Sequence, residues 1–297
     1  MASYRKRNTD GPNSEDKALD LFAEMMIEKL ETIGKDWKKP WFTEGALQWP
    51  RNLSGREYNG MNALMLMLHC EKEGYTIPRF CTFDCVQRLN KPGKDGEELP
   101  RVSVLKGEKS FPVMLTTFTC IHKETKEKIK YDDYKNLSND EKEQYNVYPK
   151  MQVFRVFNVA QTNLKEARPE LWEKLEKENG RPFVHEGEMF SFEPADRMIR
   201  DNLWICPINV KHQDDAFYSI SKNEITVPEK VQFKDGEAFY GTLFHEMGHS
   251  TGAEGVLNRF KPTSFGSKEY SDEELVAELC GALISQRYGM VKHIKED

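Results

Sequence analysis

The spacing of apolar residues predicts a mixture of helices and short strands. From Ser14 onward, apolar side chains recur every three or four positions, which indicates an amphipathic helix that ends at Gly34. Helical patterns also cover residues 62–72, 169–178, 194–203, 237–251 and 272–288, and a short helix is expected after Thr82. Strands are expected over residues 102–105, 112–118 and 152–158, and a hairpin over 216–228. The expected fold class is therefore α+β.

Segments rich in charge, Pro and Gly mark the expected domain boundaries. Residues 1–13 have the composition of a disordered tail, and the highly charged stretch 122–144 predicts a surface excursion. Within that stretch, Ser138-Asn139-Asp140-Glu141 has the spacing of a helix capping box. Asn179-Gly180-Arg181-Pro182 is typical of a linker. We therefore expect two domains, residues 14–165 and 186–297, joined by a linker helix over 166–185.

The composition excludes several classes of protein. The chain has 297 residues, of which 38% are hydrophobic and 31% charged, so it is neither collagen-like nor wholly disordered. No apolar run reaches the roughly 18 residues of a membrane span, and the N-terminus has no apolar secretory core. We therefore expect no membrane partner. The six cysteines are scattered without a CxxC pair, which favours a reduced, cytoplasmic protein.

The net charge of −6 hides a difference between the two halves. Residues 1–165 contain 27 Lys and Arg against 24 Asp and Glu, whereas residues 166–297 contain 16 against 25. The first half therefore has a charge of +3 and the second a charge of −9. This asymmetry indicates different partners for the two halves, and the average charge does not exclude a nucleic-acid partner.

The strongest chemical signal is His245-Glu246-Met247-Gly248-His249. Residues four apart lie on the same face of a helix, so His245 and His249 can bind one Zn²⁺ while Glu246 acts as general base. On a helical wheel the two histidines lie away from the apolar stripe that contains Tyr240 and Phe244. We expect that stripe to be buried and the histidines to face away from it.

A third metal ligand is expected on the helix over 272–288. Glu274 and Glu278 form a narrow acidic stripe there, and burying both requires a nearby cation or hydrogen-bond donors. Glu274 as the ligand and Glu278 as the acceptor for a histidine N–H meet that requirement. Glu278 or Glu273 would take the place of Glu274 if Glu274 serves only as the capping-box partner of Ser271.

Two further features of the second half bear on peptide hydrolysis. Tyr270, just before the second helix, is either an oxyanion donor or an ordinary packing residue. The strand expected over 216–221 is a candidate edge for pairing with an extended peptide substrate.

Several segments in both halves of the chain together form a family pattern. In the first half they include Trp37-Lys38-Lys39-Pro40-Trp41, Ser54-Gly55, Tyr58-Asn59-Gly60-Met61-Asn62-Ala63-Leu64, Leu105-Lys106-Gly107-Glu108-Lys109 and Phe154-Arg155-Val156-Phe157-Asn158. In the second half they include Ala216-Phe217-Tyr218-Ser219, the HExxH segment, Leu257-Asn258-Arg259 and Glu273-Glu274-Leu275-Val276-Ala277-Glu278. In these segments the chain resembles the ArdC-type antirestriction proteins of conjugative plasmids, and the resemblance runs in order over most of residues 20–285.

The resemblance implies a single-stranded-DNA-binding domain followed by a zincin-like metallopeptidase domain, which protect incoming plasmid DNA from host restriction. It implies His245, His249 and Glu274 as metal ligands and Glu246 as base, with Zn²⁺ or alternatively Mn²⁺ or another divalent metal bound. Two departures are evident: the charged stretch 122–148 resembles an insertion, and the chain ends soon after the second helix, where relatives often carry further helices. Part of the C-terminal lid of the peptidase cleft is then expected to be missing.

Irregular segments of the first half combine cations with aromatic side chains, as sequence-tolerant binding of single strands requires. The candidate DNA contacts are Lys38, Trp41, Arg56, Tyr58, Arg79, Lys106, Lys109 and Arg155. The alternative is that the aromatic residues belong to the core and the lysines to an ordinary solvated surface. Two alternative functions also stay open: an active peptidase whose first domain recruits protein partners, and a single-stranded-DNA-binding module with an inactive or structural metal site.

Overall fold

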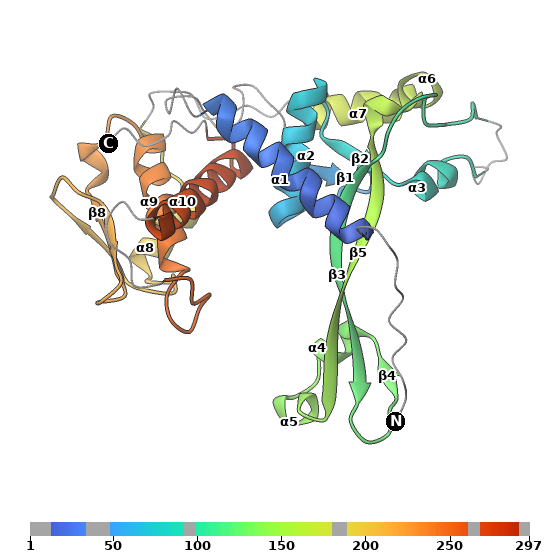
Figure 1. Ribbon diagram of the computed structural model, residues 1–297. Helices are drawn as coiled ribbons and strands as arrows, with labels where there is room; N and C mark the ends of the chain where they lie inside the picture. Colours follow the sequence, from blue (N-terminus) through green and yellow to red (C-terminus); the bar gives the residue numbers. More distant parts are fainter. Residues whose placement is uncertain (1–12, 34–47, 92–98, 180–188, 261–267, 291–297) are drawn as a thin grey trace. The chain divides into compact units, whose positions relative to one another are not determined.

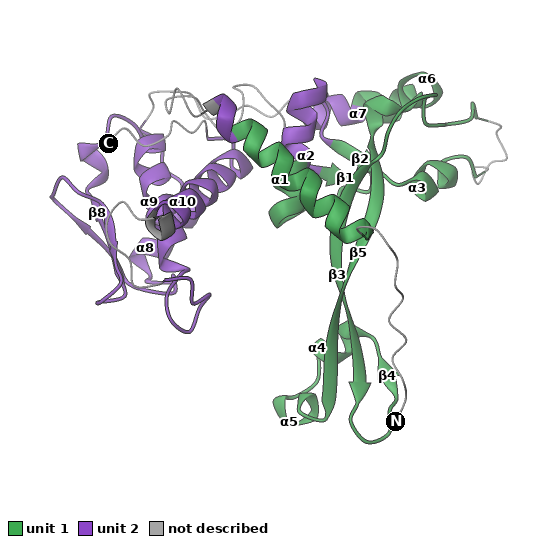
Figure 2. Cartoon of the chain, in the orientation of Figure 1, with its two compact units in different colours: residues 1–29, 51–65, 79–173 green, residues 30–50, 66–78, 174–297 purple. Residues whose placement is uncertain are grey.

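The computed structural model describes residues 13–33, 48–91, 99–179, 189–260 and 268–290. Its contacts divide the chain into two compact units, which Figure 2 shows in different colours. Unit 1 comprises residues 1–29, 51–65 and 79–173, and unit 2 comprises residues 30–50, 66–78 and 174–297. Each unit is thus assembled from separate stretches of sequence. The domain boundaries proposed from composition remain predictions.

Five of the described strands form the sheet of unit 1, in the order β1-β2-β5-β3-β4. The strands are β1 (Arg51–Asn52), β2 (Arg79–Cys81), β3 (Phe111–His122), β4 (Lys128–Ile129) and β5 (Tyr145–Asn158). β1 and β2 are parallel, and the other neighbours are antiparallel. β3 and β5 pair from Phe111↔Val156 to His122↔Tyr145, which makes the long two-stranded ribbon seen in Figure 1.

The ribbon extends the two strands expected over 112–118 and 152–158 into the charged stretch. β4, α4 (Tyr131–Lys135) and α5 (Asn139–Lys142) lie between the ends of β3 and β5 at one end of the ribbon (Figure 1). The capping box predicted at Ser138 is present and begins α5.

The strand expected over 102–105 is not formed; only an isolated bridge joins Val104 to Thr162. The side chain of Asn90 forms hydrogen bonds with both backbone groups of Val102. It donates to the Val102 carbonyl at 2.8 Å and accepts from the Val102 N–H at 2.7 Å. Those are the groups that a strand ladder would use. The expected strand is therefore missing at Val102, where side-chain bonds occupy these groups, and backbone pairing is confined to the bridge at Val104.

The helices in this part of the chain are α1 (Ser14–Ile33), α2 (Gly60–Glu73), α3 (Phe83–Arg88), η1 (Val159–Gln161), α6 (Leu164–Ala167) and α7 (Pro169–Asn179). Two of them contact β3 through specific side chains. The Phe22 ring of α1 stacks on Phe111 of β3 with ring centroids 5.9 Å apart. The Asn62 amide of α2 donates to the Met114 carbonyl and accepts from the Met114 N–H, at 2.6 and 2.8 Å. These contacts fix α1 and α2 on β3.

Unit 2 contains a smaller sheet and the two helices that carry the candidate metal ligands. The elements are α8 (Glu193–Arg200), β6 (Ile208–Lys211), β7 (Phe217–Ser219), β8 (Glu224–Pro228), η2 (Lys230–Gln232), α9 (Gly236–Ser250) and α10 (Lys268–Arg287). Among the described strands the order is β6-β8-β7, with β6 parallel and β7 antiparallel to β8. β7 and β8 form the predicted hairpin, and β7 is an edge strand. No helix among the described residues is long and apolar enough to cross a membrane.

The core of unit 2 lies between β8 and α9. Ile225 and Val227 of β8 share one buried cluster with Tyr240, Leu243 and other residues of α9. The apolar stripe expected on this helix is therefore buried, as predicted. The histidine face is buried as well, however, with His245 only 4% exposed. The helical wheel did not predict this, because α10 packs against that face.

The Tyr240 hydroxyl is a hydrogen-bond hub in this core. It donates to Asp196 Oδ1 at 2.7 Å and accepts from Phe192 N and Lys230 Nζ at 2.7 and 2.8 Å. Burial, reinforced by the Asp196 bond, raises the pKa of Tyr240 to about 12, so the phenol stays neutral. The hydroxyl thus connects α8, η2 and α9.

Removing this hydroxyl by Tyr240→Phe is expected to lower the free energy of unfolding by about 1–2 kcal/mol, because three partners lose a hydrogen bond at a partly buried site. Urea denaturation measures the change. Tyr218→Phe is the matched control, since that hydroxyl donates to Asn223 at an exposed site. Equal losses in the two variants would contradict the role of the hub.

Candidate metal centre

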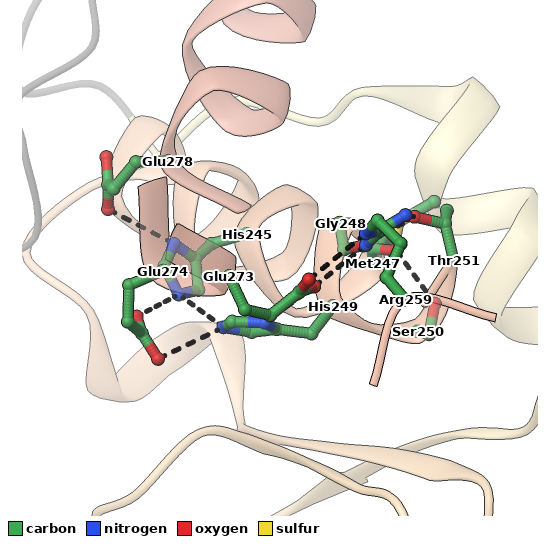
Figure 3. A network of polar contacts seen from close by, with 10 residues as sticks. All are labelled: His245, Met247, Gly248, His249, Ser250, Thr251, Arg259, Glu273, Glu274 and Glu278. Carbon is green, nitrogen blue, oxygen red and sulfur yellow. Dashed lines mark hydrogen bonds and ion pairs between the residues drawn. The ribbon is translucent and has the colours of Figure 1, made fainter. Parts of the chain in front are cut away.

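Two helices bring the candidate ligands together. His245 and His249 lie one turn apart on α9, and Glu274 and Glu278 lie one turn apart on the adjacent α10 (Figure 3). The Nε2 atoms of His245 and His249 are 3.1 Å apart. Glu274 faces both rings, with Oε2 at 3.4 Å from His245 Nε2 and Oε1 at 3.5 Å from His249 Nε2. The three side chains therefore converge on one point.

These spacings fit a tetrahedral metal. Metal–nitrogen and metal–oxygen bonds of about 2.0–2.2 Å place neighbouring tetrahedral donors about 3.3–3.6 Å apart. The two imidazole nitrogens are 3.1 Å apart, and each faces a different oxygen of Glu274, at 3.4 Å from His245 and 3.5 Å from His249, which is close to that range. Among the described residues, His245, His249 and Glu274 form the group of His, Cys, Asp or Glu side chains that could hold a metal ion. Two imidazoles and a carboxylate are also the ligand types that Zn²⁺ takes in catalytic sites.

The outer nitrogens of both imidazoles face carboxylates. His245 Nδ1 lies 3.1 Å from Glu278 Oε1, and His249 Nδ1 lies 3.5 Å from Glu273 Oε1. A carboxylate at Nδ1 favours the tautomer with its proton there, which leaves the Nε2 lone pair for a metal. The predicted placement of Glu278 beside a histidine agrees with this geometry. The contact of Glu273 with His249 was not predicted, because Glu273 was considered only as a substitute ligand.

The charges around His245 call for a cation. Burial alone lowers the pKa of His245. The carboxylates of Glu274, Glu278 and Glu246 raise this pKa by more than burial lowers it, to about 9. The three carboxylates thus favour positive charge at this position. A divalent cation at the same place neutralises more of the surrounding negative charge.

The structure also bears on the alternative for Glu274. α10 begins at Lys268, so Ser271 lies inside the helix and is not its N-cap. The capping-box interpretation of Ser271 and Glu274 is therefore excluded. Glu246, the proposed base, is buried with 3% of its surface exposed. The side chain of Tyr270 lies outside the described residues.

The predicted DNA contacts divide into three groups. Lys38 and Trp41 lie outside the described residues. Arg79 is only 8% exposed in β2, and Tyr58 is half-buried with its ring edge-on to Phe80. Burial also raises the pKa of Tyr58 to about 12. These two residues have little surface to offer a nucleic acid.

The remaining four candidates are exposed: Arg56, Lys106, Lys109 and Arg155. Lys106 and Lys109 directly precede β3, and Arg155 pairs with Pro112 near the start of that strand. Three cations thus lie at the same end of the β3–β5 pair. Phe154 is 41% exposed and is absent from the predicted contacts, but it directly precedes Arg155 in β5, so the two side chains point to opposite faces of the strand.

Each half of the chain matches the model of a known protein family. Residues 16–159 match the family described as the N-terminal domain of anti-restriction factor ArdC, and residues 195–297 match the zincin-like metallopeptidase family MPTase-PolyVal. Crystal structures of antirestriction protein ArdC from plasmid R388, metal-free and Mn(II)-bound, both give a TM-score of 0.57 at 22% identity. In both cases the match covers 91% of this chain and 82% of the other.

Sequence comparison also finds three similar proteins. Two Escherichia coli proteins named DNA primase TraC are 28% and 27% identical over 91% and 90% of this chain. The chain spans only 17% and 23% of their lengths. The uncharacterized protein y4eC of Sinorhizobium fredii is 27% identical over 87% of this chain and 73% of its own length.

Proposed function

We infer that this chain has the ArdC-type organisation, in which an antirestriction N-terminal domain is followed by a zincin-like metallopeptidase domain. From this premise we propose that the protein binds single-stranded DNA and hydrolyses peptide bonds at a divalent-metal site. The observation that carries the second part is the convergence of His245, His249 and Glu274 beside the buried Glu246. The role that follows is protection of incoming plasmid DNA from restriction.

The arrangement suits a catalytic centre better than a structural one. Three protein ligands leave a fourth position for water or substrate, whereas structural zinc sites are closed by four. A bound Zn²⁺ or Mn²⁺ supplies Lewis acidity to a scissile carbonyl and to water. Glu246 accepts a proton from the attacking water and returns it to the leaving amine. Glu278 and Glu273 keep the two imidazoles oriented.

The substrate of this site would be an extended peptide. β7 is an edge strand among the described strands of unit 2, so its outer backbone groups can pair with another chain. We place the protein in the cytoplasm, supported by its six free cysteines, four of which are buried.

Single-stranded DNA is the proposed partner of the first domain. The N-terminal ArdC family match, the two relatives named as DNA primases and the exposed cations at Lys106, Lys109 and Arg155 support it. Cations that follow the nucleic-acid backbone supply the electrostatic part of sequence-tolerant single-strand binding.

Changing Lys106, Lys109 and Arg155 together to Ala is expected to weaken binding to a labelled single-stranded oligonucleotide. Each lost phosphate contact lowers the magnitude of the slope of log affinity against log salt concentration by about 0.7. The slope of the triple variant should therefore be smaller in magnitude by about 2. Fluorescence anisotropy across a salt series measures this slope, with double-stranded DNA as a comparison.

The matched control changes Lys123, Lys128 and Lys130, three exposed lysines of the charged stretch, to Ala. It removes the same charge and should leave the slope near that of the parent chain. An equal drop in both variants would indicate a diffuse electrostatic effect. No preference for single strands in the parent chain would favour the alternative in which the first domain recruits proteins.

A further inference from the structure

The segment that follows α9 contains Leu257-Asn258-Arg259, which neither the metal ligands nor the general base account for. We propose that Arg259 is a positioning residue of the metal centre, which holds Glu273 and through it fixes His249 in its metal-binding orientation. This inference rests on the proposed metal site, although not on the identity of any substrate.

The backbone after α9 folds back onto the end of that helix. Leu257 N donates to Thr251 O at 3.2 Å, and Arg259 N donates to Gly252 O at 3.0 Å. Asn258 adopts a φ of 48°, and its side-chain oxygen accepts from Gly255 N at 2.7 Å. Asn tolerates this left-handed conformation better than most residues. The turn therefore delivers Arg259 to the C-terminal end of α9.

The guanidinium group of Arg259 binds four acceptors there (Figure 3). Nε and Nη2 donate to Glu273 Oε2 and Oε1 at 3.0 and 2.8 Å, which is the bidentate arrangement of a strong ion pair. Nη1 donates to Thr251 Oγ1 at 2.8 Å, and Nη2 also donates to the Gly248 carbonyl at 3.0 Å. The bond to Glu273 is the main cause that raises the pKa of Arg259.

One oxygen of the same carboxylate also faces the imidazole of His249. Glu273 Oε1, which accepts from Arg259, is also the atom 3.5 Å from His249 Nδ1. Its neighbour Glu274 is the proposed ligand, so rotation of Glu273 would place a second carboxylate beside the metal. Arg259 prevents that rotation by binding both oxygens. Arg259 thereby keeps the carboxylate of Glu273 beside Nδ1 of His249, so that Nε2 of the same ring stays available for the cation.

The test is a Co²⁺ titration of the full chain, because tetrahedral Co²⁺ reports both affinity and ligand geometry through its visible absorption. Arg259→Gln should weaken Co²⁺ binding by about 10–100-fold and alter the absorption band, as losses outside the ligand shell commonly do. Glu273→Gln should give a similar loss. The double variant should lose little more than either alone, since both act through one interaction.

Two further variants separate positioning from structural effects. Arg259→Lys keeps the charge but not the paired donors, so it should recover the affinity only in part. Arg197→Gln is the matched control, because Arg197 forms an exposed ion pair with Asp201 in the same unit; it should bind Co²⁺ as the parent chain does. Thermal melts in EDTA establish that each variant is folded.

An Arg259→Gln protein that melts earlier yet binds Co²⁺ with unchanged affinity and absorption would overturn the proposal, since Arg259 would then serve the fold alone. Absence of Co²⁺ binding by the parent chain would overturn it together with the metal site. A parent chain that binds Co²⁺ but cleaves no peptide would overturn only the proposed peptidase activity.

Discussion

Glu246→Gln is expected to lower peptide hydrolysis by about 10²–10⁴-fold, the usual contribution of a general base. Gln has nearly the same shape as Glu but cannot accept the proton of the attacking water. Glu246 is 3% exposed in α9 and is not one of the three converging ligands. Its replacement should therefore leave the affinity for Zn²⁺ nearly unchanged, so that activity and metal binding separate.

The measurement is degradation of casein, or cleavage of the chain itself, with Zn²⁺ or Mn²⁺ added. Glu254→Gln is the matched control, because Glu254 is an exposed carboxylate shortly after the same helix. It should retain the parent rate. Equal rates in the parent chain and in Glu246→Gln would remove the basis for the peptidase proposal. A parent chain that binds metal without hydrolysing any peptide would favour the DNA-binding module with an inactive site.

The ligand pattern could be predicted from the sequence because it depends on helical periodicity. The four-residue spacings of His245 with His249, and of Glu274 with Glu278, each predict one face of one helix. Periodicity does not say which helix covers that face. The histidines were expected to face away from the core, whereas α10 buries His245 to 4% exposure.

The parts that could not be predicted depend on contacts between distant residues. Glu273 and Arg259 are 14 positions apart and meet only because the backbone after α9 turns back. Asn90 binds the backbone of Val102 across 12 positions and so prevents a strand that local composition favours. In both cases a single side chain determines the local structure, and the periodicity of the sequence does not predict its contact.

Gly248 illustrates the same limit and leads to the second large expected effect. A Cβ at this position would lie 3.0 Å from Ala277 Cα and 3.1 Å from Cys280 Cβ, both on α10. Backbone atoms cannot rotate out of the way as a side chain can. Gly248→Ala is therefore expected to push α10 away from α9 and to lower the free energy of unfolding by about 1–3 kcal/mol.

The displacement should also reach the metal site, because Glu274 and Glu278 lie on α10 on either side of Ala277. We expect Gly248→Ala to weaken Zn²⁺ binding by about 100-fold, comparable to the upper range for losing a supporting residue. Urea denaturation in EDTA measures the stability, and competition with a chromogenic chelator measures the metal affinity.

Gly241 provides the matched control on the same helix. A Cβ there would meet no atom within 4 Å, so Gly241→Ala should raise stability by about 0.4–1 kcal/mol through the lower entropy of the unfolded chain. Its effect on Zn²⁺ affinity should be negligible. The same substitution two turns apart is thus expected to change stability in opposite directions. If both variants are stabilised and both bind Zn²⁺ normally, the close approach of α10 at Gly248 is not what holds Glu274 against the two histidines.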